Sequence, residues 1–156
     1  MDAKVIDLRV LGIAKAPLVA LESSRDVPFE IKRVYYLFGA AAGTSRGFHA
    51  HKKLQQLMIC IGGACRVLLQ DGKEEMEVFL NKPNMGLYVG PMIWREIHDL
   101  SQDCVVVVLA DQYYDEDDYI RDYERFLQMT GNKSRLGTSS SQATRCGKSM
   151  TNIGCS

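Results

Sequence analysis

The sequence predicts an all-β fold with one C-terminal helix, on the strength of three observations. Between residues 4 and 110, short segments rich in β-branched and aromatic residues alternate with turn residues. No helical pattern in this stretch is long enough to connect two parallel strands, so we expect the strands to be antiparallel. A helical pattern appears only after residue 114. A chain of 156 residues can bury one good core, and we expect one domain.

The β-rich region divides into segments of strand length. Strands are expected at Lys4–Val10, Leu18–Leu21, Ile31–Phe38, Gly47–His51, Leu54–Ile61, Ala64–Leu69, Met76–Leu80, Gly86–Val89 and Cys104–Ala110. The pairs Asp71-Gly72 and Gly62-Gly63 are predicted to form hairpin turns, because the tightest turns need positive φ angles.

The C-terminal part is expected to contain one amphipathic helix over Asp115–Met129, with Asp115 as its N-cap. The apolar side of this helix should cover one end of the β-structure, which we expect to be a barrel. From Gly131 onwards the sequence consists mainly of small and polar residues, which cannot offset the entropy cost of ordering. We therefore predict a folded domain over residues 1–130 and a flexible, low-complexity tail over 131–156.

Composition argues against several classes of protein. The formal net charge is zero, so a nucleic-acid partner is not expected. The sequence has no apolar run of membrane-spanning length and no signal-peptide pattern at its start, which favours a cytoplasmic protein without a membrane partner. The five cysteines contain no CxxC pair, and Cys60 and Cys104 lie in apolar runs, where we expect free thiols to act as small buried hydrophobes.

The sequence Gly47-Phe48-His49-Ala50-His51 contains the strongest candidate site. Alternate residues of a strand face the same way, so His49 and His51 should share one pocket. Isolated pairs of this kind are often surface or hydrogen-bonded histidines without a function, so the neighbouring residues must decide.

The spacing around the pair resembles the first motif of the cupin family, which implies a cupin jelly-roll barrel. Gly43, His49, His51 and Gly62 match that motif, but Gln55 stands at the position of a metal-binding carboxylate. The region of the second motif, Gly90–Arg95, ends in an arginine, which cannot bind a metal. We therefore expect no metal and interpret the histidines as groups for acid–base catalysis.

Basic and phenolic side chains are candidates for completing this site. Strand alternation puts Arg33 and Tyr35 on one face, where they would add a cation and a proton carrier. Tyr35 could equally be an ordinary strand aromatic. Arg46, Lys52 and Lys53 flank the histidines, and solvent-exposed loop charges are the simpler interpretation for them.

Longer motifs resemble the dTDP-sugar 3,4-ketoisomerases over about residues 4–127. They are Ile31–Tyr36, Arg46–Leu54, Gly86–Pro91 with Trp94, and Val108–Ala110 followed by Tyr113–Arg121. The resemblance implies an isomerase that converts dTDP-4-keto-6-deoxyglucose to its 3-keto isomer without a cofactor, for a later transamination at C3. It also implies a homodimer with exchanged N-terminal strands.

The same resemblance assigns roles to the residues. His49 would be the base that removes the C3 proton, and His51 and Tyr35 would orient the substrate and relay the proton. The substrate would be bound by Arg33, Arg46, Lys53, Trp94 and Arg95. Arg95 is similar to the type that leaves the C4 hydroxyl equatorial, whereas Lys15 keeps the charge of the axial type. A dTDP-sugar epimerase and a non-catalytic sugar-binding cupin are the alternatives.

Overall fold

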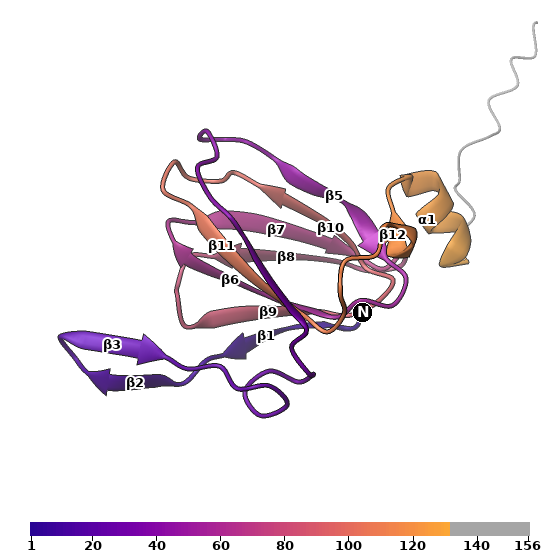
Figure 1. The fold of residues 1–156 in the computed structure, drawn as a ribbon. Coiled ribbons are helices and arrows are strands. Elements are labelled where there is room, and N and C mark those ends of the chain that lie inside the picture. The colour runs from indigo at the N-terminus through magenta and orange to yellow at the C-terminus, as the bar shows by residue number, and fades with distance from the viewer. Residues whose placement is uncertain (132–156) are drawn as a thin grey trace, which may run out of the picture.

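The computed structural model describes residues 1–131 and shows a jelly-roll sandwich of two antiparallel sheets (Figure 1). One five-stranded sheet has the order β1 (Ala3–Asp7), β9 (Met85–Val89), β6 (Gln56–Gly62), β11 (Val105–Ala110) and β4 (Arg33–Leu37). The other has the order β12 (Tyr119–Ile120), β5 (Arg46–His51), β10 (Trp94–His98), β7 (Cys65–Gln70) and β8 (Glu75–Leu80). The predicted all-β jelly-roll class is confirmed.

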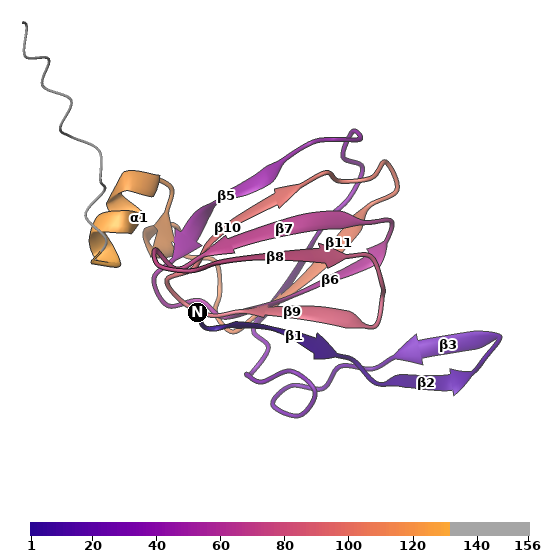
Figure 2. The ribbon, with the colours of Figure 1, turned by 180° about the vertical axis from the view of Figure 1, so that it is seen from behind.

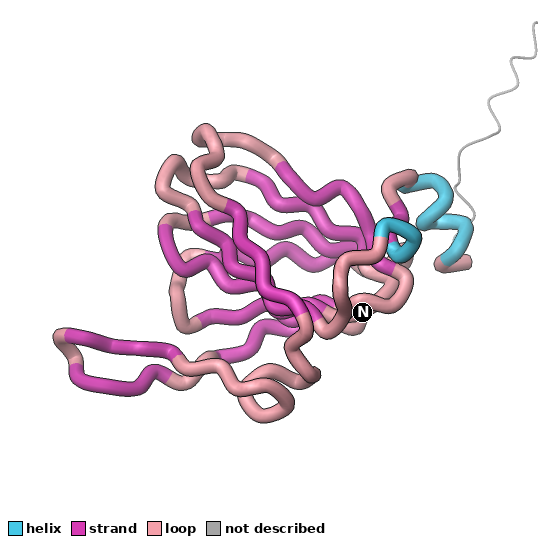
Figure 3. The backbone as a smooth tube through the Cα atoms, in the orientation of Figure 1, coloured by secondary structure: helices cyan, strands magenta, loops and turns pink. Residues whose placement is uncertain are grey.

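The main core lies between the two sheets and follows from strand alternation. On β7, Cys65, Val67 and Leu69 are buried, while the residues between them are partly exposed. Complete burial of a Val or Leu side chain contributes about 1.5–3 kcal/mol, so such strands hold the sandwich together. The tube in Figure 3 shows how much of the described chain is strand rather than helix.

The two predicted glycine turns differ in outcome. The Asp71-Gly72 pair does connect two adjacent strands, β7 and β8, with Gly72 at φ +89°. Asp71 Oδ1 accepts hydrogen bonds from the backbone N–H groups of Lys73 and Glu74. The prediction of a hairpin at Gly62-Gly63 is wrong, because β6 and β7 belong to different sheets and this turn is a corner where the chain changes layer.

The predicted C-terminal helix is shorter than expected. The structure has a 3₁₀ turn η1 (Glu116–Asp118), then β12, then a helix α1 (Tyr123–Met129). Asp115 caps η1, and Asp122 caps α1 by accepting the Arg125 N–H at 2.7 Å. The shorter helix has a physical cause, since pairing Tyr119 with His51 of β5 satisfies backbone groups of β5 that a longer helix would leave unpaired. Neither described helix is long enough to cross a bilayer.

Strand prediction failed in two other places. The strand β10 was missed because Arg95 and Glu96 interrupt its apolar pattern. The expected strand Lys4–Val10 is divided between β1 and β2 (Val10–Ile13), and β2 pairs only with β3 (Ala16–Val19) among the described strands. This β2–β3 hairpin projects from the sandwich, as Figure 2 shows from behind. The predicted tail lies outside the described residues beyond Gly131.

Candidate active site

The two histidines lie on the inner side of β5, which lies between β12 and β10 in the sheet. A β-bulge shifts the register between β5 and β10, so that His49 is opposite Arg95 and Gly47 is opposite Glu96. Gly47 has φ +93°, and a Cβ atom there would lie 2.8 Å from the Arg95 carbonyl oxygen. Only glycine allows the two backbones to come this close. Gly47 therefore determines how the histidine pair is placed against β10.

Hydrogen bonds fix the same tautomer in both imidazoles. His49 Nδ1 donates to the Gly47 carbonyl oxygen at 3.0 Å, since a carbonyl only accepts. His51 Nδ1 lies 3.0 Å from Asp118 Oδ2. Both rings therefore carry their proton on Nδ1. His51 Nε2 is buried and has no hydrogen-bond partner among residues 1–131, which leaves its lone pair available to a substrate.

Asp118 positions the deeper histidine. Its side chain is 7% exposed, and its second oxygen accepts the Lys53 N–H at 2.9 Å. The backbone of Asp118 also accepts the Lys52 N–H at 2.9 Å. Sequence reasoning missed this residue, because it stands in an acidic run that we interpreted as the start of a helix.

Tyr119 was also missed, although it touches both histidines. Its ring centroid lies 4.2 Å from that of His51 and 5.0 Å from that of His49. The Arg121 guanidinium stacks on the other side at 4.3 Å and is paired with Glu116. The two imidazoles are themselves 4.9 Å apart and perpendicular. The segment after β11 thus forms one wall of the site.

A chain of hydrogen bonds joins Arg95, Gln56 and Tyr35 beside the histidines. Arg95 is only 2% exposed and donates to the Gln56 side-chain oxygen and, at 2.8 Å, to the Ile93 carbonyl. Gln56 in turn donates to the Tyr35 oxygen at 2.7 Å. Because that oxygen is the acceptor, the Tyr35 proton remains free to be donated elsewhere.

The position of Gln56 corrects one detail of the motif. Gln55, which we placed at the carboxylate position, instead contacts Asp111 and Tyr88. The amide that faces the site is Gln56, one residue later. Its neutral character leaves the conclusion about the ligand set unchanged.

The residues at this site do not fit the metal that many cupins hold. His49 and His51 offer two nitrogen ligands, but the carboxylate position holds an amide and the remaining position holds the buried guanidinium of Arg95. A permanent cation beside two neutral ligands opposes binding of a divalent ion.

Burial and charge set the ionisation of the site. Burial lowers the pKa of His49 to about 4; its Gly47 hydrogen bond opposes this shift, and the charge of Arg95 adds a smaller lowering effect. Burial, Arg95 and His49 lower the pKa of His51 to about 2. Burial lowers the pKa of Arg95 to about 10 and raises that of Tyr35. At neutral pH the site therefore holds two neutral imidazoles, a phenol and a cation.

Three other residues predicted from the sequence lie at different distances from the histidine pair. Arg33 lies 5.2 Å from the Tyr35 ring and 5.6 Å from the Tyr114 ring, with a buried Nε that has no partner in the described chain. Arg46 is exposed at the start of β5, at the end away from His51. The Lys53 side chain is exposed beside the His51 turn.

Trp94 is placed differently from the prediction. Its ring packs beneath α1 against Tyr123 and Phe126, and its Nε1 donates to Glu96 at 2.9 Å. Successive residues of β10 face opposite ways, so Trp94 points outward where Arg95 points inward. These contacts anchor the helix, and a substrate contact of Trp94 stays a prediction.

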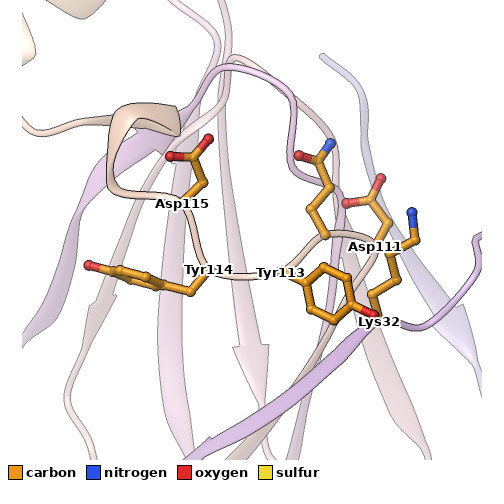
Figure 4. A pocket seen from close by; sticks show the side chains of 6 residues that line it. Lys32, Asp111, Tyr113, Tyr114 and Asp115 are labelled. Carbon is orange, nitrogen blue, oxygen red and sulfur yellow. The ribbon is translucent and has the colours of Figure 1, made fainter.

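A hollow of about 400 Å³ adjoins the site at the ends of β4 and β11. Figure 4 shows Lys32, Asp111, Tyr113 and Tyr114 around it. The Tyr114 ring is 5.8 Å from the Tyr119 ring, which connects this hollow to the wall of the histidine site. An extended ligand could therefore reach from the histidines towards two exposed tyrosines.

A jelly roll with an inward-facing HxH pair defines a cupin-type protein. Residues 1–131 match the family described as "FdtA: WxcM-like, C-terminal". A TDP-4-oxo-6-deoxy-α-D-glucose 3,4-oxoisomerase of Aneurinibacillus thermoaerophilus is 52% identical over 126 residues, which are 81% of this chain and 91% of that protein. The chain therefore belongs to the sugar 3,4-ketoisomerase family.

Solved structures agree with this assignment. A sugar 3,4-ketoisomerase of Thermoanaerobacterium thermosaccharolyticum, as a histidine-to-asparagine variant with TDP-4-keto-6-deoxyglucose, has 39% identity and a TM-score of 0.81, covering 87% of this chain and 98% of its own. A Bacillus anthracis dTDP-4-dehydrorhamnose 3,5-epimerase has 20% identity and a TM-score of 0.67, covering 76% and 77%. At that identity, the likeness to the epimerase is one of fold alone.

Proposed function

We propose that this protein isomerises dTDP-4-keto-6-deoxyglucose to the 3-keto sugar, without a metal or other cofactor. The observation that carries the proposal is a pair of neutral imidazoles whose Nε2 atoms have no hydrogen-bond partner in the described chain, beside a buried arginine that contacts no carboxylate there. Such a site can remove a proton from carbon and stabilise the anion that results.

The proposed reaction begins at C3, whose proton is acidified by the C4 ketone. His49 Nε2 accepts that proton, and the electrons form an enediolate whose oxygen is stabilised by the Arg95 cation. The C3 hydroxyl proton passes to the C4 oxygen, and the proton taken by His49 is returned to the C4 carbon, so the carbonyl moves to C3 and a hydroxyl is left at C4. His51 and Tyr35 orient the sugar and relay protons, since Tyr35 has a free O–H and His51 a free Nε2.

The pKa values of both histidines lie below the ordinary histidine value of about 6.5. A neutral base is present throughout the physiological pH range, but its intrinsic basicity is lower. Binding of an anionic diphosphate nearby raises a histidine pKa again, because an opposite charge favours the protonated form. We propose Arg33 and Arg46 as the cations that hold the diphosphate, with Lys53 as an outer contact.

A homodimer is the assembly that we propose, as the sequence resemblance implies. Support comes from the β2–β3 hairpin, which leaves its own sandwich and exposes Val10, Ile13 and Leu18. Because β1 pairs with β9 of the same chain, an exchange would involve the hairpin rather than β1. Given a nucleotide-sugar substrate, we propose that the protein works in the cytoplasm.

The direct test is to incubate the protein with dTDP-4-keto-6-deoxyglucose and assign the product by NMR. We expect a 3-keto sugar, and the spectrum also decides the C4 configuration, for which Arg95 and Lys15 give opposite predictions. Exchange at C5 with the carbonyl kept at C4 would indicate an epimerase. Binding without any turnover would indicate a sugar-binding module. Either result overturns the proposal.

A further inference from the structure

Three cysteines converge at the end of the sandwich opposite the histidines. Cys60 lies near the end of β6, Cys65 begins β7, and Cys104 immediately precedes β11. Figure 1 shows the connections β6–β7 and β10–β11 at the end away from β12 and α1. The proposed reaction uses none of these side chains.

The three sulfur atoms are close enough to share one ion. They lie within 4.8 Å of one another, and Cys60 and Cys104 are 3.8 Å apart. A triangle with sides of at most 4.8 Å has a point within about 2.8 Å of all three corners. Zinc–thiolate bonds are about 2.3 Å long, so shifts of about half an ångström complete three such bonds.

Neighbouring turns hold these cysteines in place. The Ala64 N–H donates to Ser101 Oγ at 3.0 Å, and the Cys104 N–H donates to the Ser101 carbonyl at 3.0 Å. Gly63 has φ +62°, and a Cβ atom there would lie 2.8 Å from the Cys104 nitrogen. The turns that carry Cys65 and Cys104 are thus held together by hydrogen bonds and close packing, which favours a preformed site.

The electrostatics of the cluster favour a bound cation. A hydrogen bond from Cys65, with help from Cys104 and the backbone at Gly62 and Val105, lowers the pKa of Cys60 to about 6. The pKa of Cys65 is raised by its bond to Cys60, and burial raises that of Cys104 to about 11. A metal binds cysteine as the thiolate, so all three side chains must be deprotonated when an ion binds, with any thiol protons lost to solvent.

We propose that Cys60, Cys65 and Cys104 form a binding site for a soft, thiophilic metal ion such as Zn²⁺ or Cd²⁺. Thiolates are the ligands that such ions prefer. The Gly62 carbonyl oxygen accepts a hydrogen bond from Cys60 Sγ at 3.0 Å, a contact that is given up when this thiol loses its proton to bind a metal. The role of the ion is structural, because it links β6, β7 and the start of β11.

Cadmium titration of the full chain tests this proposal, since each Cd–thiolate bond adds charge-transfer absorption in the ultraviolet. The background protein carries Cys146→Ala and Cys155→Ala, which remove the only other cysteines. We expect one Cd²⁺ per chain, absorption corresponding to three thiolates, and a melting temperature raised by about 5 °C at saturation. Adding Cys65→Ala should remove the binding while turnover is kept.

Two results would overturn the proposal. One is an absorption that corresponds to fewer than three thiolates in the background protein, a measurement that does not depend on whether Cys65→Ala folds. The other is loss of Cd²⁺ binding in His49→Asn with retention in Cys65→Ala, which would move the ion to the histidine pair. Both readouts are independent of the proposed ketoisomerase activity.

Discussion

The two ends of the sandwich differ in what they bury: one contains polar groups that can act on a ligand, and the other contains apolar packing that stabilises the fold. The end near β12 contains buried polar side chains, and His51 Nε2 and Arg33 Nε have no partner among the described residues. At the opposite end, Cys60, Cys65 and Cys104 are packed in the main apolar core. Unsatisfied buried polar groups destabilise a protein, so their concentration at one end marks the place where a ligand is expected.

Replacing Arg95 should have the largest effect at the polar end. We expect Arg95→Gln to lower kcat by about 10²–10³-fold, because the enediolate loses its buried counter-charge. The melting temperature should not fall, since the arginine is buried without a carboxylate partner. Steady-state kinetics and thermal denaturation measure the two effects. Arg66→Gln, which removes a partly exposed arginine paired with Asp99, is the matched control. Equal losses of kcat in both variants would refute a specific role for Arg95.

Replacing Asp118 should have the next largest effect on kcat. In Asp118→Asn an amide can donate to His51 Nδ1, which moves the imidazole proton to Nε2 and removes the free lone pair. We expect kcat to fall about 10²-fold with little change in KM. Nitrogen NMR of His51 should report the changed tautomer, a readout that a merely structural role would not move. The neighbouring exposed residue gives the control variant, Asp117→Asn, which should keep normal kinetics.

These residues illustrate what could be learned from sequence alone. The histidine pair, Tyr35 and Arg95 were found because strand alternation puts i and i+2 on one face and the motif spacing is regular. Asp118 and Tyr119 were not recognised as site residues. They are brought to the histidines by the pairing of the short strand β12 with β5, which is a contact between distant parts of the sequence. The cysteine cluster was missed for the same reason, since its members are 39 residues apart along the chain between Cys65 and Cys104.

The fold shows a similar division. Alternating patterns located most strands of both sheets, but they could not reveal which strand joins which sheet, so Gly62-Gly63 was mistaken for a hairpin. The bulge at Gly47 and Phe48, which sets His49 opposite Arg95, depends on a close approach of two backbones. No local propensity encodes that approach.

A smaller effect is expected on stability as the pH falls. The pKa values of His49 and His51 are lower in the folded protein than in the unfolded chain. Below pH 6.5 the unfolded state therefore takes up protons that the folded state does not, and stability decreases. Each histidine should cost about 1.4 kcal/mol per pH unit between pH 6 and pH 5. Urea unfolding of the wild type and of the His49→Asn, His51→Asn double variant measures the difference, and parallel pH profiles would contradict it.

The smallest expected effect is that of a metal chelator. Turnover should be the same in EDTA, because the histidine site lacks a carboxylate ligand and contains Arg95. Removal of an ion from the cysteine cluster at the other end should change the melting temperature but not kcat. Activity lost in EDTA and restored by one metal ion per chain would show that the two ends are not independent.

The central claim is that His49 removes the C3 proton, and His49→Asn in deuterated solvent tests it most directly. Asparagine keeps part of the hydrogen bonding of histidine but cannot accept a proton from carbon. We predict that the variant binds dTDP normally, yet loses both turnover and deuterium incorporation at the sugar carbons, by at least the roughly 10²–10⁴-fold that a general base contributes. Near-normal turnover, or deuterium entering at C3 at the wild-type rate, would contradict the account.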